Sequence, residues 1–114
     1  MRFAGYAAVW DRVDRAGDVV RRGAFSGAGA VPLLRDHRGA PVGEITAIGE
    51  NARGLRVEGI AQGPVLVGQG LSVGYRARRA RQGVWRELFD YELIEVSLVG
   101  QPMQPLARVD RVGG

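Results

Sequence analysis

The sequence predicts a mainly β fold, a small closed or partly open β-barrel with little helix. Roughly six to eight short apolar or alternating stretches are separated by turns rich in Gly, Pro and Asn. No window combines a sustained helical period with caps at its ends. The chain has 114 residues, enough for one modest core, so we expect a single domain over residues 1–114.

The first half of the chain begins with an apolar stretch, Phe3–Trp10, which predicts a strand. A short strand starts at Asp18 and gives way to a glycine-marked turn before Phe25. The Ser26–Ala30 segment is too rich in glycine for a helix and predicts at most one turn. Val31–Leu34 then predicts a short strand that delivers the polar cluster Arg35–Gly39 to its end.

Two further strands are expected over Val42–Gly49 and Leu55–Ala61, joined by a turn at residues 50–54. Gly70–Tyr75 predicts the next strand, and an arginine-rich segment continues from it to Arg81. After a turn at Gln82 and Gly83, the chain returns over Val84–Phe89. Leu93–Val99 is the strongest strand pattern, and the tail from Gly100 onward is expected to be loosely held.

The net charge is +4, and all 16 basic residues are arginine. Charges of both signs are interspersed, which indicates a generally solvated surface rather than a nucleic-acid interface. Cysteine is absent, so disulfides and thiolate chemistry are excluded. With no apolar run of membrane-spanning length and no signal-peptide pattern, we expect a soluble intracellular protein without membrane contact.

The inventory of reactive side chains is short. His37 is the only histidine, so any mechanism with a histidine base must use it. A hydroxyl nucleophile must be one of four residues: Ser26, Ser72, Ser97 or Thr46. Histidine metal clusters are unavailable and no carboxylate spacing indicates a metal site, so we expect neither metal nor cofactor.

Ser72 lies in a strand where successive side chains alternate between two faces. Leu71, Val73 and Tyr75 therefore share one face. Ser72 shares the other face with two glycines, Gly70 and Gly74, and so stands on an open patch of backbone. The stretch fits a small-residue strand packed under a neighbour, or an exposed nucleophile on a rigid element.

Two other polar residues need an explanation. Glu95 interrupts an apolar strand, and a buried carboxylate is costly unless it is hydrogen-bonded or paired. It therefore faces solvent, has a partner or belongs to a site. His37, among charged residues after a strand, fits either a loop histidine or a general base.

Taken together, these stretches resemble one family, the tailed-phage prohead maturation proteases, which are relatives of the herpesvirus assembly protease. The matching blocks follow the family's order along most of the chain. They are Gly5-Tyr6 with Val9-Trp10, Gly17–Val20 with Gly23–Phe25, Val31–Leu34 with Asp36-His37, Val42–Ile45, Gly54–Gly59, Leu71–Tyr75, Leu93–Val99 and Pro102.

The resemblance implies a herpesvirus-protease-like fold and three active-site residues: Ser72 as nucleophile, His37 as general base and Glu95 as the group that orients the histidine. Glu92 is the alternative orienting carboxylate, and Asp36 is too close to His37 in sequence to be preferred. The family pattern makes Ser97 structural, although it is otherwise a rival nucleophile. The oxyanion-binding groups are not identified; backbone N–H groups near Gly100 are one possibility.

The resemblance also implies a serine endopeptidase that cleaves capsid or scaffold protein inside an assembling phage-like prohead in the cytoplasm, with cleavage of the chain itself as a further option. It requires no cofactor, and a homo-oligomer is compatible with it. Arg76 and Arg78 are expected on the same strand face as Ser72, where they would bind substrate. The alternative is a catalytically inactive basic module that binds scaffold or nucleic acid through residues 76–81.

The chain departs from the family pattern at two places. A helical segment usual before the serine strand is shortened here to Ala61–Gly70. Met103 stands after the proline where the family usually has alanine. The short chain is similar to the compact forms found in gene-transfer-agent head clusters.

Overall fold

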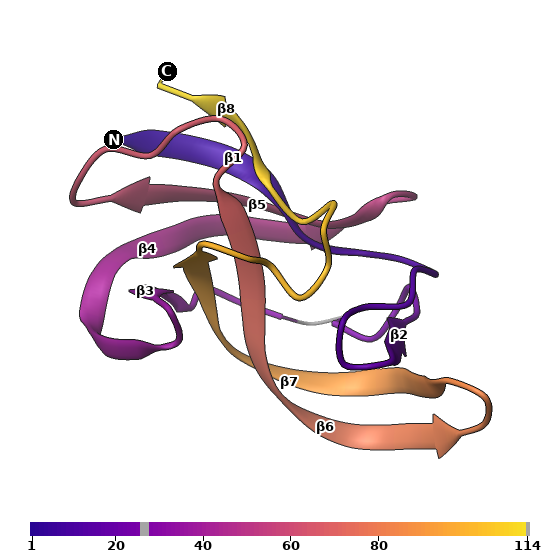
Figure 1. The fold of residues 1–114 in the computed structure, drawn as a ribbon. Helices are drawn as coiled ribbons and strands as arrows, with labels where there is room; N and C mark the ends of the chain where they lie inside the picture. The colour runs from indigo at the N-terminus through magenta and orange to yellow at the C-terminus, as the bar shows by residue number, and fades with distance from the viewer. Residues whose placement is uncertain (26–27, 114) are drawn as a thin grey trace.

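A computed structural model describes residues 1–25 and 28–113, and every regular element in this part of the chain is a β-strand (Figure 1). The predicted turn over Ser26–Ala30 begins at residues outside this description. The strands are β1 (Arg2–Val9), β2 (Asp18–Val20), β3 (Pro32–Arg35), β4 (Arg38–Glu50), β5 (Gly54–Ala61), β6 (Gly70–Gln82), β7 (Arg86–Val99) and β8 (Val109–Val112).

Strand β7 organises the sheet because three other strands pair with it. Its first residues pair in parallel with β2, and its last residues pair in parallel with β3. Along its other edge, β7 pairs with β6 in one long antiparallel hairpin, interrupted by three register shifts. The far end of this hairpin extends away from the rest of the molecule (Figure 1).

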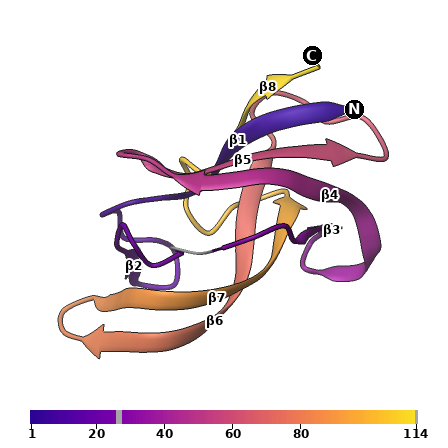
Figure 2. The ribbon, with the colours of Figure 1, turned by 180° about the vertical axis from the view of Figure 1, so that it is seen from behind.

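The sheet continues from β3 through β4, β5 and β1 to β8. It curves back until the segment just before β8 reaches the start of β6, where Gly70 and Arg108 form an isolated bridge rather than a continuous strand pairing (Figure 2). The sheet is therefore not closed. The prediction of a mainly β domain with a partly open barrel is confirmed.

The hydrophobic core lies on the concave face of this sheet. Its fully buried side chains come from most of the strands and include Leu33, Leu55, Leu71 and Val96. Val73 and Tyr75 pack against the same cluster, so the face predicted to carry Leu71, Val73 and Tyr75 is the one toward the core. Side chains at alternate positions of β6, including Ser72, therefore lie on the opposite face.

Two strand predictions need correction. The stretches over residues 84–89 and 93–99 were expected to be separate, but β7 runs through both because its bulges opposite β6 absorb the irregular pattern between them. Strand β4 begins at Arg38 rather than Val42, because it follows directly from a two-residue turn after β3.

The expectation of a loosely held tail is wrong. Pro102, Gln104, Ala107 and Val109 are all buried, and the chain ends in strand β8 against β1. The reason is backbone pairing: the N–H of Leu71 donates to the Ala107 carbonyl at 2.9 Å. The tail thus covers the edge of β6 as far as Leu71.

Candidate active site

The β3–β4 turn presents His37 to the site. Arg35 pairs with Arg38, so only Asp36 and His37 form the loop, and their φ angles are 53° and 62°. Positive φ at both central residues is the geometry of a type I′ hairpin turn. Asp and His are among the few non-glycine residues enriched in this region of backbone space. The turn is anchored to β7, because the Asp36 N–H donates to the Leu98 carbonyl at 3.0 Å.

Glu95, on β7, is the partner of the histidine. Its side chain is only 8% exposed, and its Oε1 atom lies 2.5 Å from His37 Nδ1. The other oxygen, Oε2, accepts a hydrogen bond from the Ser97 hydroxyl at 2.7 Å. Both carboxylate oxygens are therefore engaged, as a buried carboxylate requires.

Gly74 provides the space for this carboxylate. It lies opposite Glu95 in the β6–β7 register, and a Cβ atom at this position would clash with Glu95 Oε1 and Cδ. A Cβ at Gly70 would likewise meet the Val99 carbonyl and Pro102. The expectation of an open backbone patch around Ser72 is therefore wrong at both glycines, because other parts of the same chain fill the space.

Ser72 lies at the edge of this arrangement. It pairs with Ser97 across the β6–β7 ladder, and the residue is 9% exposed. Ser72 and His37 line the same cavity, about 120 Å³ in volume. Among the described residues, the Ser72 hydroxyl makes no hydrogen bond to the imidazole. Catalytic hydrogen bonds are often long in the absence of substrate and shorten when it binds.

The cavity beside Ser72 has mostly apolar walls. The contributing residues come from β1, β2, β6 and the tail, and they include Ala7, Val20, Leu71, Val73 and Met103. Asp14 lies in the same lining, and burial raises the pKa of its carboxyl group above the ordinary 3.8. The nucleophile and base candidates thus border a hollow with a mainly apolar lining, of the kind that small-molecule and side-chain pockets have.

The rival candidates lie elsewhere. Ser97 is completely buried behind the network, so it is not accessible to a substrate. Glu92 lies 3.2 Å from Arg78 in an exposed ion pair and does not contact His37. Thr46 is exposed on β4, where its hydroxyl donates to the Glu58 carbonyl. Ser26 lies outside the described residues.

The two arginines predicted to bind substrate lie further along β6. Arg76 is opposite Glu92 in the register, two positions beyond Gly74, and it is exposed. Arg78 lies at a bulge and contacts Glu92. Neither lines the cavity beside Ser72, and the same is true of the exposed Gly100, whose neighbourhood was considered for oxyanion binding.

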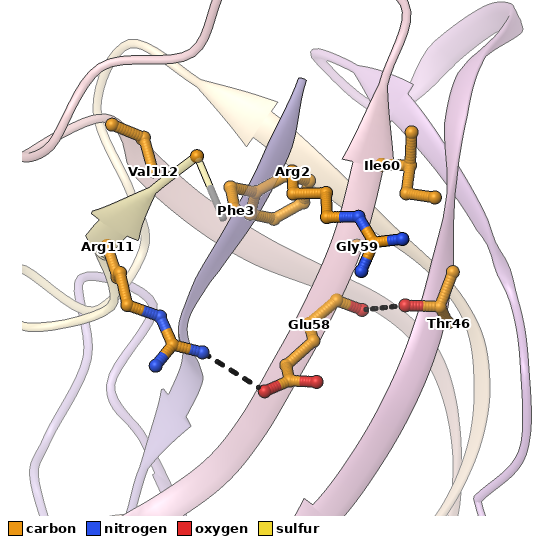
Figure 3. Close-up of a pocket in the computed structure, with 9 residues that line it drawn as sticks. Arg2, Phe3, Thr46, Glu58, Gly59, Ile60, Arg111 and Val112 are labelled. Atoms are coloured by element: carbon orange, nitrogen blue, oxygen red, sulfur yellow. Dashed lines mark hydrogen bonds and ion pairs between the residues drawn. The ribbon is translucent and has the colours of Figure 1, made fainter.

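A larger hollow than the cavity beside Ser72 lies elsewhere on the described surface. It has a volume of about 440 Å³ and lies across β1, β4, β5 and β8 (Figure 3). Its charged residues Arg111 and Glu58 form an exposed ion pair at 3.3 Å. It shares no lining residue with the cavity beside Ser72, so size alone does not identify the reactive site.

Comparisons with known proteins add no assignment. The chain matches no known protein-family model, and a search of curated proteins found no significant match. Within residues 1–25 and 28–113, no group of three or more metal-ligating side chains is placed to hold a metal ion. The same residues contain no helix of sufficient length and apolar character to span a membrane.

Sequence reasoning proposed Ser72, His37 and Glu95 for the site and a structural role for Ser97, but it did not show what Ser97 and Gly74 contact. Ser97 contacts both Glu95 and the backbone of His37, and Gly74 makes room for the carboxylate. The alternation of Glu95 and Ser97 along one strand face was a usable signal for the first. The signal for the second was the absence of a side chain at Gly74. It is informative only when the pairing that places Glu95 opposite Gly74 is known.

Proposed function

We propose that this protein is a serine endopeptidase in which Ser72 is the nucleophile and His37 the general base, oriented by Glu95. The observation that carries the proposal is the His37–Glu95 contact of 2.5 Å beside the cavity that Ser72 and His37 share. A base held by a buried carboxylate, beside a serine that lines the same cavity, is the arrangement that activates a serine.

The chemistry follows from the order of these groups. His37 Nε2 takes the proton of the Ser72 hydroxyl as its oxygen attacks the scissile carbonyl. The resulting imidazolium is stabilised by Glu95 and then donates that proton to the leaving amine, which leaves an acyl-enzyme on Ser72. Water, deprotonated by the same imidazole, releases the acyl group. No metal or cofactor takes part in any step.

The edge of β6 supports binding of an extended peptide. The tail covers this edge through the Leu71 N–H, and alternation places the N–H and C=O of Val73 on the same side. β6 has no other partner strand than β7 in the described structure, apart from the Gly70–Arg108 bridge. An extended substrate can therefore pair with β6 immediately beside Ser72.

The resemblance described above suggests the substrate: capsid or scaffold protein of a phage-like particle, cleaved during prohead maturation, with cleavage of the chain itself as a further possibility. This setting would place the protein in the cytoplasm, within the assembling particle. An extended segment of such a substrate fits the open edge of β6 and the apolar cavity beside it.

The alternative function, a basic module for scaffold or nucleic acid, has weaker support. In the β6–β7 hairpin, Arg78 pairs with Glu92 at 3.2 Å and Arg81 pairs with Glu87 at 3.0 Å. Acidic residues of the same hairpin thus offset much of the positive charge. Phosphate binding would have to displace these partners, whereas the active-site geometry needs no rearrangement of charge.

The proposal is tested by incubating the purified protein with the capsid or scaffold protein of its own particle. Removing the nucleophile of a serine triad costs on the order of 10⁶ in rate, so Ser72→Ala should abolish cleavage. Thr46→Ala removes an exposed hydroxyl far from the site and should cleave normally. A folded Ser72→Ala protein that still cleaves at the wild-type rate would falsify the assignment.

A further inference from the structure

Ser97 touches both parts of the candidate site that the mechanism requires to stay fixed. Its hydroxyl oxygen accepts the backbone N–H of His37 at 3.0 Å and donates to Glu95 Oε2 at 2.7 Å. The mechanism assigns it no chemical step. We infer that Ser97 is a positioning residue that sets the tautomer of His37.

The direction of the hydrogen-bond chain follows from one obligatory donor. A backbone N–H can only donate, so the Ser97 oxygen must accept from His37. The single hydroxyl hydrogen of Ser97 is then directed to its other neighbour, Glu95 Oε2. Glu95 is consequently an acceptor at this oxygen, and the proposal assigns the same role to Oε1, which then accepts the hydrogen on His37 Nδ1 at 2.5 Å.

This direction leaves Nε2 of the neutral imidazole without a hydrogen, which is the form a general base needs. In neutral histidine one ring nitrogen carries the hydrogen, and the partner of that nitrogen decides which one. Ser97 therefore acts on the base through Glu95, by preventing the carboxylate from turning away. Ser97 is completely buried, so bulk solvent does not supply a competing donor to Glu95 Oε2 in the wild-type protein.

The same serine holds the backbone that carries the base. His37 has a φ of 62°, in the left-handed region, where a non-glycine residue is held by its surroundings at some energetic cost. Two hydrogen bonds attach the turn to β7: Asp36 N–H to the Leu98 carbonyl and His37 N–H to Ser97 Oγ, each 3.0 Å. Without the hydrogen bond between His37 N–H and Ser97 Oγ, the turn is attached to β7 by one bond only, so the imidazole can shift relative to Glu95.

The expected loss of activity rests on the proposed function, whereas the tautomer of His37 can be measured without any activity. His37 is the only histidine, so selective ¹⁵N labelling of histidine gives one set of ring signals. At a pH where the ring is neutral, we expect the wild-type protein to show a protonated Nδ1 and an unprotonated Nε2. Ser97→Ala should show a mixture of the two tautomers.

A matched control separates this effect from general destabilisation. Val96→Ala removes a completely buried side chain from the neighbouring position of β7, on the core side, and should leave the tautomer unchanged. If Ser97→Ala does not fold, Ser97→Cys keeps the shape of the side chain, with a somewhat larger atom, and replaces the hydroxyl with a weak donor. The cysteine variant should then show the mixture.

Kinetics give the second readout. Outer hydrogen-bond partners of metal-bound histidines typically contribute 10- to 100-fold, and by analogy kcat of Ser97→Ala should fall by roughly that factor with KM unchanged. A folded Ser97→Ala or Ser97→Cys protein with the wild-type tautomer would overturn the inference, whatever its activity. A wild-type protein with the expected tautomer but no peptidase activity would instead overturn the proposed function and leave the role of Ser97 intact.

Discussion

Nδ1 of His37 lies 2.5 Å from Oε1 of Glu95, although 58 residues separate the two in sequence. The β3–β4 turn and strand β7 bring them together, because β3 pairs in parallel with the last residues of β7. Because the Glu95 carboxylate is buried, separating it from His37 would be strongly unfavourable. The pair is therefore a product of the sheet topology as well as of the two side chains.

Gly74→Ala should disable the site with little effect on the sheet. The new methyl group would occupy the space of the Glu95 carboxylate and force it away from His37. Because the orienting group is lost, we expect kcat to fall by two or more orders of magnitude, up to the ~10⁴ seen when the acid of a triad is replaced. Steady-state kinetics on the folded variant measure this loss.

The control for this variant is Gly100→Ala, whose added methyl group meets nothing within 4 Å. It should retain wild-type kinetics and thermal stability. A Gly74→Ala protein with wild-type kcat would show that the position of Glu95 is unimportant for turnover.

The cavity beside Ser72 should select compact aliphatic side chains at the cleaved position. Its volume is about 120 Å³, below the ~150 Å³ of an apolar cavity that holds a benzene molecule. Peptides with alanine or valine before the cleaved bond should therefore be hydrolysed faster than peptides with phenylalanine. The comparison of kcat/KM values across a peptide series measures this preference.

Met103 should contribute to that selectivity because it lines the cavity and is 45% exposed. It also stands where the resembled family usually has alanine. Met103→Ala should widen the cavity and reduce the discrimination against phenylalanine by roughly 10-fold, the order expected for a few methylene groups. Equal discrimination before and after the substitution would place the side-chain pocket elsewhere.

The two arginines on β6 should differ in their contribution to substrate binding. Arg78 already contacts Glu92, whereas Arg76 is exposed and has no ion-pair partner in the described part of the chain. Arg76→Ala should therefore raise KM for an acidic substrate and leave kcat nearly unchanged, and Arg78→Ala should have a smaller effect. The opposite ranking, or a loss confined to kcat, would contradict a docking role.

Asp14 links the site to the pH dependence of stability. Burial raises the pKa of its carboxyl group above the ordinary 3.8, so the ionised form is less stable in the folded state. This cost is absent below the ordinary pKa, develops as pH rises from there to the raised pKa, and is constant above it. The melting temperature of Asp14→Asn, relative to wild type, should therefore increase as pH rises above the ordinary 3.8 and then level off.

Asparagine retains an oxygen that can accept the N–H groups of Ala16 and Asp18, each 2.9 Å from Asp14 Oδ1. The local turn should consequently survive the substitution. A relative melting temperature that decreases over the same pH range would show that the Asp14 charge stabilises the fold instead.

Much of the fold was predictable because its strands have local signals. Alternation in residues 55–61 and the apolar run at 93–99 correspond to β5 and the end of β7. Strand β8 was missed, although Ala107 and Val109 alternate with charged residues, because it is short and its stability comes from pairing with β1. The length of β7 depends on its pairing with β6 and on bulges, which no local pattern shows.

For the candidate site, residue types were predictable and their contacts were not. Ser72, His37 and Glu95 stand out by composition and by family resemblance. The role of Ser97 depends on a hydrogen bond across 60 residues of sequence, which only the fold supplies. The glycine at position 74 was also visible in the sequence. Its purpose was not, because the carboxylate that fills the space beside it belongs to Glu95 on a different strand.

The most direct test of the central claim is to treat the folded protein with a fluorophosphonate and locate the adduct by mass spectrometry. Such reagents phosphonylate a serine whose hydroxyl is activated by a neighbouring base. The account predicts a single adduct on Ser72, formed at least 10³-fold more slowly in His37→Ala. An unmodified wild-type protein, an adduct on another residue, or equal rates with and without His37 would contradict it.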